Sequence, residues 1–356
     1  MTYAIISFIP SSFIFLIGSI RGILISISRD NWFGAWFGFE LNLIIFIPLI
    51  LGAGHRIEVE SRLKYFLVQV IGSVVFLWGI FLSVNYDGDS IITVYNSYKG
   101  GLVIWSGLII KLGVVPFQLW VPARIAGVSW FCCFLLSTLQ KIAPLVFLIF
   151  FCETYRIWGV LVGGLRRIVG GIGGINQTQL RPLIGYSSIG HIGWILGGLS
   201  SGGTKVAIFY FSCYFIVSLG LFLYLRILGI FYLKSFSQAF LGIKRLSLIY
   251  LSLFLLSIRG FPPFLIFLGK ISILYRIFDF YIWIPLYLLG ALVRLYYYLN
   301  LMLSWILSRC ICRISSEISL SNSHRLGIRL LLGQFSISFI IIFSFVIARN
   351  YDCTLT

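Results

Sequence analysis

Apolar stretches of roughly 20 residues recur from one end of this 356-residue chain to the other, with short polar connections between them. A helix of that length crosses the hydrocarbon core of a bilayer, which is about 30 Å thick. A transmembrane β-barrel would show shorter segments of alternating polarity instead. The pattern predicts an all-α membrane protein, a single polytopic membrane domain over residues 1–356 that leaves no room for a water-soluble catalytic domain.

The charge content supports a membrane domain and argues against nucleic acid as a partner. Charged residues make up 10% of the chain and mean hydropathy is +1.03, whereas a soluble domain carries about 25% charge. The 27 Lys and Arg residues outnumber the 10 Asp and Glu residues, which gives a net charge of +17. Because the basic residues lie mostly in short gaps between apolar stretches, we interpret them as topology determinants and as contacts to membrane lipids such as cardiolipin.

Polar clusters, glycine, proline and charge divide the chain into about eleven predicted spans. They cover residues 3–20, 32–52, 64–84, 100–120, 128–151, 155–176, 183–200, 204–230, 247–269, 276–303 and 330–348. The first stretch lacks the basic region and cleavage site of a signal peptide, so it is kept as a span. Loops after even-numbered spans carry about twice as many Lys and Arg residues as the others, so the N-terminus is predicted on the positive side and the C-terminus opposite.

Neither the cysteines nor the glycines predict a cofactor site. The seven cysteines form no CxxC pair and lie mostly in apolar runs, so we interpret them as small apolar fillers. The glycine-rich segment around Gly170 and Gly174 contains no GxGxxG fingerprint, and its spacing is typical of close helix packing. The sequence therefore predicts that this chain binds no metal and no redox cofactor.

Ionisable residues inside the predicted spans are the candidates for function, because a charge at the bilayer centre costs at least about 2.5–3.5 kcal/mol. The candidates are Glu40, Lys111, Lys141, His191 and Lys270. Each has a structural alternative: a packing hydrogen bond for the glutamate, a snorkelling stem for the lysines, and a buried core position for the histidine. Arginines 226, 259 and 294 are predicted to snorkel or to bind lipid rather than to carry protons.

Prolines connect these charges to a mechanism. Proline removes a backbone donor and clashes with the preceding turn, so Pro116 and the Pro262–Pro263 pair are predicted to interrupt the fourth and ninth spans. Interrupted helices in two halves of a membrane protein are a pointer to an ion pathway near the midplane. Lys111 precedes Pro116 by about 7.5 Å of helix rise, so this lysine and the helix break are expected to form one site, with Glu40 as the acid that switches its charge.

Several strings, in this order and spacing, resemble the mitochondrial NADH dehydrogenase subunit 2 family. They are NWFGAWFGFELNLIIFIPLI, SRLKYFLVQVIGS, KLGVVPFQLWVP, SWFCCFLLSTLQKIAPL, GGINQTQLRPLIGYSSIGHIGWIL and GFPPFLIFLGK. The resemblance covers residues 31 to about 300, the expected antiporter-like core, and the predicted C-terminal span at 330–348 matches only in hydropathy. The family is one of the antiporter-like, proton-translocating subunits in the membrane arm of respiratory complex I.

The resemblance implies a role for each candidate. Glu40 and Lys111 match the family's central glutamate–lysine pair, and Lys141 matches the connecting lysine of its hydrophilic axis. His191 matches a polar relay position, and Lys270 matches the terminal lysine on the second interrupted helix.

The resemblance also implies a place in a larger assembly. The chain is expected to be a subunit of H⁺-translocating NADH:ubiquinone reductase, a translocase without a redox centre of its own. NAD, FMN, iron–sulfur clusters and ubiquinone would belong to other subunits, and neighbouring antiporter-like and accessory subunits would be its partners. The expected location is the mitochondrial inner membrane, N-terminus in the matrix and C-terminus in the intermembrane space. The alternative is a free-standing secondary cation/proton antiporter, with similar broken helices and buried charges.

Two departures from the family pattern bear on these roles. Ala123 follows Val121 and Pro122 where relatives carry a glutamate, and Arg259 precedes Gly260 where relatives read GGLPPF. An arginine beside the second break would perturb Lys270. The alternative is a misread codon, which the two methionines in so long a chain also suggest, and a peptide mass spectrum across residue 259 distinguishes the two.

Overall fold

The computed structural model describes residues 10–29, 31–50, 56–87, 98–229, 245–311, 327–334 and 336. Within these ranges the chain is helical and contains no β-strand, as the length of the apolar stretches predicts. The first half comprises α1 (Pro10–Ser28), α2 (Trp32–Ile50), α3 (Arg56–Asp87), α5 (Tyr98–Leu112), α6 (Trp120–Ala126), α7 (Trp130–Ser137) and α8 (Leu139–Phe151). The second half comprises α9 (Arg156–Ile175), α10 (Leu180–Ser200), α11 (Thr204–Leu228), α13 (Arg245–Arg259), α14 (Leu265–Ile277), the 3₁₀ helix η1 (Phe278–Trp283) and α15 (Ile284–Ile311).

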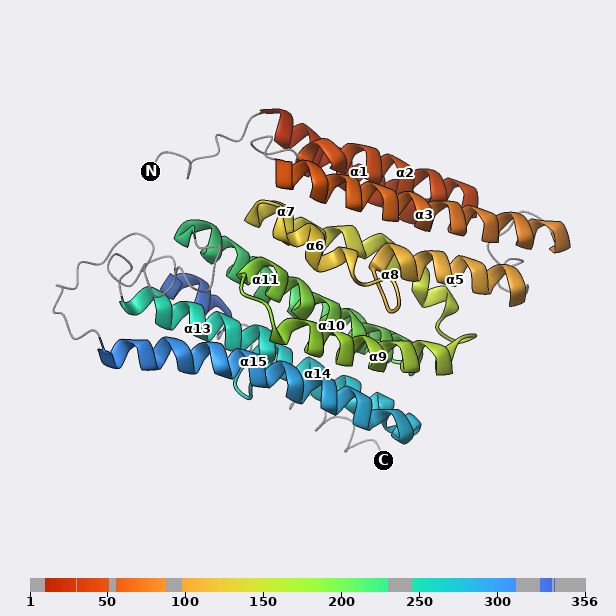
Figure 1. Ribbon diagram of the computed structural model, residues 1–356. Coiled ribbons are helices and arrows are strands. Elements are labelled where there is room, and N and C mark those ends of the chain that lie inside the picture. The colour runs from red at the N-terminus through yellow and green to blue at the C-terminus, as the bar shows by residue number, and fades with distance from the viewer. Residues whose placement is uncertain are drawn as a thin grey trace.

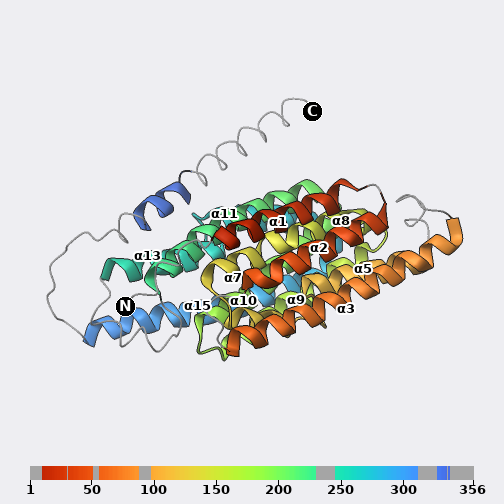
Figure 2. The same ribbon diagram turned by 90° about the horizontal axis from the view of Figure 1, so that it is seen from above.

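The helices lie side by side, and their order in the bundle follows their order in the chain. Figure 1 shows α1 to α3 at one edge, α5 to α8 beside them, α9 to α11 in the middle, and α13 to α15 at the other edge. Seen from above in Figure 2, the helix axes again share one general direction. The closest pairs are α1 with α2, α3 with α5, and α9 with both α10 and α15. Such an arrangement suits a bundle whose axes cross a bilayer.

Five helical stretches of the described chain are long and apolar enough to cross a membrane. They are Trp32–Ile50, Glu58–Ser83, Trp130–Phe151, Thr204–Leu228 and Leu265–Met302. These stretches coincide with predicted spans, and the total of about eleven stays a prediction. Two predicted boundaries were wrong. The first helix runs to Ser28, beyond the expected end at residue 20, and the stretch Leu265–Met302 covers the gap expected between residues 269 and 276. Residues 3–9 of the first predicted span and most of the last one, 330–348, lie outside the described residues.

The close approach of α9 to its neighbours follows from its glycines. A Cβ at Gly170 would lie 2.9 Å from the Tyr186 carbonyl oxygen of α10, and one at Gly174 would lie 2.8 Å from the Tyr297 ring of α15. Both contacts are too short for a side chain to fit without a shift. The small-residue packing predicted for this pair is confirmed.

Two helices end in the same way, shortly before the prolines that were expected to interrupt them. At the end of α5, Gly113 has φ +65° and its N–H donates to the Ile110 carbonyl, while the Val114 N–H donates to the Ile109 carbonyl. Both bonds together form a Schellman motif, in which a left-handed glycine ends the helix. The chain turns before Pro116 and resumes helix at Trp120.

The end of α13 repeats this geometry. Gly260 has φ +64° and its N–H donates to the Ser257 carbonyl, while the Phe261 N–H donates to the Leu256 carbonyl. The prolines at 262 and 263 follow, and α14 begins at Leu265. The sequence signal at each break is thus a glycine that stops one helix and a proline that cannot continue it.

Candidate functional site

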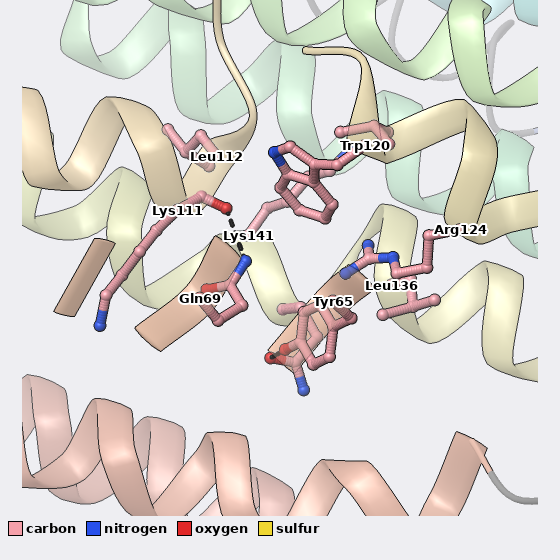
Figure 3. Close-up of a pocket in the computed structure, with 10 residues that line it drawn as sticks. Tyr65, Gln69, Lys111, Leu112, Trp120, Arg124, Leu136 and Lys141 are labelled. Atoms are coloured by element: carbon pink, nitrogen blue, oxygen red, sulfur yellow. Dashed lines mark hydrogen bonds between the residues drawn. The ribbon is translucent and has the colours of Figure 1, made fainter. Parts of the chain in front are cut away.

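A small cavity beside the first break brings together two of the predicted lysines, as Figure 3 shows. The cavity volume open to water is about 20 Å³, enough for at least one water molecule. Polar and charged side chains dominate its lining, which comprises Tyr65, Gln69, Lys111, Leu112, Trp120, Val121, Arg124, Leu136, Gln140 and Lys141. Five helices, α3, α5, α6, α7 and α8, supply these residues.

Lys111 lies in the last turn of α5 and is 7% exposed. Its ammonium nitrogen lies 4.1 Å from the centre of the Phe39 ring and 5.8 Å from that of Phe76, so aromatic faces partly replace water around the charge. Glu40 follows Phe39 on α2 and is partly buried. No ion pair within 4 Å joins Glu40 to Lys111, although both residues lie in the described chain. The predicted pair is therefore near in space but separated.

The helix break leaves carbonyl groups that side chains from other helices satisfy. The Gln69 amide of α3 donates to the Lys111 carbonyl at 3.0 Å, a contact visible in Figure 3. Arg166 of α9 donates to the Leu112 carbonyl at 3.2 Å and to the Ile189 carbonyl at 2.7 Å. Cations are favoured at the negative end of a helix. The break is thereby fixed from both sides of the bundle.

A pair of side-chain amides connects α2, which carries Glu40, to α8, which carries Lys141. Asn42 of α2 and Gln140 of α8 exchange two hydrogen bonds of 2.9 and 3.1 Å, and the Tyr65 hydroxyl donates to the Gln140 carbonyl oxygen at 3.3 Å. Arg124 of α6 covers the faces of Tyr65 and Trp120, 4.4 and 4.5 Å from the two ring centres. Arg124 falls between the predicted spans 100–120 and 128–151, but it is 3% exposed, because α6 packs against α3 and α10.

Lys141 extends the cavity towards the middle of the molecule. It lies in the first turn of α8, just after an interruption of the helix at Thr138, and is 6% exposed. Its ammonium nitrogen has no hydrogen-bond partner among the described residues. The nearest aromatic face is Tyr214 of α11, whose ring centre lies 6.0 Å away. Burial without a counter-charge makes the charged form of a lysine costly, so Lys141 is a candidate for proton exchange.

His191 packs against the same tyrosine. The His191 and Tyr214 rings are stacked, with centres 4.7 Å apart and an angle of 28°. The Nδ1 atom of His191 lies 2.8 Å from the Tyr210 hydroxyl. Tyr214 therefore lies near both Lys141 and His191, and it was not among the predicted site residues. A tyrosine in an apolar helix offers little signal by itself, since most such residues only pack.

A second cavity, beside the second break, contains Lys270 and His191. Lys270 lies on α14 and its ammonium group donates to the Arg259 carbonyl, the last of α13. At both breaks, then, a basic side chain caps the final carbonyl of the first helix segment. Arg259 and Arg294, predicted to snorkel or bind lipid, are 9% and 3% exposed and face the interior, so that prediction was wrong.

The structure divides the five candidates between two neighbouring sites. Lys111 and Lys141 share the first cavity with Glu40 nearby, and His191 and Lys270 share the second. The sequence analysis missed Gln69 and the Asn42–Gln140 pair. Polar side chains close to Glu40 and Lys141 inside apolar spans were the available signal. Among the described residues no group of three or more His, Cys, Asp or Glu side chains is placed to hold a metal ion.

Comparisons with known proteins agree on one family. The family model of the NADH:quinone oxidoreductase/Mrp antiporter transmembrane proteins matches residues 29–294. The chain is 32% identical over 289 residues to NADH-ubiquinone oxidoreductase chain 2 of Lumbricus terrestris, covering 80% of this chain and 84% of the relative. It is 36% identical over 299 residues to the chain of the same name from Anopheles gambiae, covering 82% and 84%.

A similar fold occurs in a solved structure titled as respiratory complex I from Thermus thermophilus with bound aureothin. The TM-score is 0.76 at 20% sequence identity, and the match covers 92% of this chain and 78% of that one. The fold of the described helices is therefore the antiporter-like fold expected from the sequence motifs.

Proposed function

The chain belongs to the NADH-ubiquinone oxidoreductase chain 2 family, and on that premise we propose how its two cavities work. It is a membrane-arm subunit of complex I that takes part in proton translocation, whereas NADH oxidation and ubiquinone reduction take place in other subunits. One observation carries the proposal: two buried lysines, Lys111 and Lys141, line a water-sized cavity beside a helix break. NAD, FMN, iron–sulfur clusters and ubiquinone are assigned to the rest of the complex.

The proposed path starts at Glu40 and Lys111. When the Glu40 carboxylate approaches, Coulomb attraction stabilises the ammonium form of Lys111, and when it withdraws, burial favours release of the proton. The present separation of more than 4 Å leaves room for both arrangements. Gln69 and Arg166 hold the helix end still, so the motion falls on the side chains. Water in the cavity is the proposed carrier from Lys111 to Lys141.

From Lys141 the proposed path continues into the second cavity. Tyr214 lies near both Lys141 and His191, and His191 shares its cavity with Lys270. We assign Tyr214 a positioning role, because it holds the histidine ring by stacking. Lys270, next to the second helix break, is the proposed end of the path towards the exit or the neighbouring subunit.

The proposed topology completes the picture. The chain is a single membrane domain of about eleven spans in the mitochondrial inner membrane. The segments α5 and α6 form the interrupted fourth span, and α13 and α14 form the interrupted ninth. The N-terminus lies in the matrix and the C-terminus in the intermembrane space. Antiporter-like and accessory subunits and lipids such as cardiolipin cover its outer faces.

Native electrophoresis of mildly solubilised membranes tests the assignment to an assembly. We expect the chain to migrate with a band of high mass that stains for NADH dehydrogenase activity in the gel. A free-standing antiporter would migrate as a small separate species, and that result would contradict the proposal.

Proton counting tests the path itself. In an assembled Lys111→Met variant we expect a lower proton-to-electron ratio in sealed vesicles, because the side chain keeps its length but loses the exchangeable proton. Lys205→Met, at an exposed lysine near the start of α11, is the matched control and should leave the ratio unchanged. An unchanged ratio in an assembled Lys111→Met variant would remove Lys111 from the path.

A further inference from the structure

The second cavity is surrounded by positive charge. Its lining contains three arginines, a lysine and a histidine but no Asp or Glu among the described residues. The complete lining is Arg167, Ser187, His191, Ile258, Arg259, Lys270, Ala291 and Arg294. As whole residues, Arg167, Arg259 and Arg294 are 0%, 9% and 3% exposed, so bulk water does little to compensate their charge. Buried cations without a counter-charge are costly, by several kcal/mol per ion.

Five guanidinium nitrogens of these arginines have no hydrogen-bond partner in the described part of the chain. Arg167 has Nε and one Nη without a hydrogen-bond partner in the described part of the chain, Arg259 has Nε and one Nη, and Arg294 has one Nη. Aromatic rings lie over the faces of two of these guanidinium groups. The Trp194 ring centre lies 3.7 Å from Cζ of Arg167, and the Tyr298 ring centre lies 4.4 Å from Cζ of Arg259. The N–H donors at the edges of these groups have no acceptor among the described residues. Buried donors in proteins are normally hydrogen-bonded, so a bound acceptor is expected here.

The position of Arg294 depends on a glycine. A Cβ built on Gly190 of α10 would overlap the Arg294 guanidinium, so only glycine at 190 leaves room for it. On its own helix, the Nε atom of Arg294 donates to the Gly290 carbonyl at 3.0 Å. The guanidinium is thus held between two helices with one Nη left for a ligand.

We propose that this cavity binds one small inorganic anion of the chloride class, held by Arg167, Arg259 and Arg294. The cavity volume open to water is about 10 Å³, about the space of a single water molecule. A space of this size excludes phosphate and sulfate. Each N–H that turns to the anion forms a charge-assisted hydrogen bond. The anion balances the arginine charges beside Lys270, the proposed end of the proton path.

Binding of chloride-36 to the purified assembly tests the site. We expect saturable binding in the wild type that becomes at least tenfold weaker in Arg294→Gln, because one of three charged donors is lost. Arg156→Gln, at an exposed arginine on α9, is the matched control and should bind as the wild type does. Equal binding by wild type and Arg294→Gln, or no saturable binding, overturns the proposal.

Two measurements on the unmodified assembly avoid the risk that a variant fails to assemble. Crystals soaked in bromide should show an anomalous peak in contact with the arginines of the cavity, and a peak absent from this cavity overturns the proposal. Peptide mass spectra should read arginine at positions 167, 259 and 294, and a smaller residue there removes the donors and with them the site. Neither outcome bears on the Lys111 proton count, so the two proposals fail independently.

Discussion

At the scale of single residues, the buried polar side chains are arranged in reciprocal contacts. Asn42 and Gln140 exchange two hydrogen bonds between α2 and α8, so each amide satisfies the other. Asn42→Leu should destabilise the chain by about 1–3 kcal/mol, the cost of a buried amide left without its partner. In a Gln140→Leu background the same change should cost less than about 1 kcal/mol, because no amide is orphaned. The temperature at which the subunit aggregates in the purified assembly ranks the variants by stability. Equal destabilisation by Asn42→Leu in both backgrounds would contradict the coupling between Asn42 and Gln140.

Cys152, between α8 and α9, gives a chemical prediction at the same scale. Burial, with a smaller effect of the neighbouring Glu153 carboxylate, raises the pKa of this thiol to about 12 from its usual 9.0. Its Sγ donates to the Leu148 carbonyl at 2.9 Å. Since maleimide reacts with the thiolate, labelling at pH 8 should be slower in the folded chain by up to about a thousandfold, and it should speed up as the pH rises. Chain unfolded in detergent is the control, and equal rates would contradict the burial.

At the scale of elements, the Schellman turn that ends α5 allows a controlled test of the break. Gly113 and Gly229 both have positive φ, 65° and 64°, so alanine strains the backbone similarly at either, by about 1–2 kcal/mol. A Cβ at Gly113 would also press on Trp120 and Val121, whereas no described atom lies within 4 Å of one at Gly229. Gly113→Ala should therefore lower the thermal midpoint clearly more than Gly229→Ala. Equal shifts of the thermal midpoint in the two variants would mean that α6 moves away from the new Cβ at position 113 without cost.

The elements also show how far sequence reasoning reaches. Helix type was predictable, because the length of the apolar stretches is a local signal, and α5 and α13 end shortly before Pro116 and Pro262. The burial of Arg124 was not, since it depends on α6 folding back against Tyr65. The role of Tyr214 was hidden for a similar reason: its importance comes from residues 141 and 191, which approach it only in the folded bundle.

At the scale of the whole molecule, each half contains one of the two cavities beside a helix end. Each half has a helix ended by a left-handed glycine, a proline after it, and a basic side chain on the last carbonyl. Lys111 and Lys141 line the first cavity, His191 and Lys270 line the second, and the Tyr214 ring lies near both Lys141 and His191. This arrangement makes a serial path across the molecule the simplest one, and a serial path has a definite genetic signature.

This signature is that the effects of replacing Lys111 and Lys270 on the proton-to-electron ratio do not add. Lys111→Met and Lys270→Met should each lower the proton-to-electron ratio by the same amount, and the double variant should lower it no further, because steps that act as one unit fail together. Two independent paths would instead give a double variant that loses the sum. The ratio in sealed vesicles, normalised to assembled complex, measures this, with Lys205→Met in each background as control. A further loss in the double variant would separate the two cavities into distinct conduits and confine the role of Tyr214 to packing.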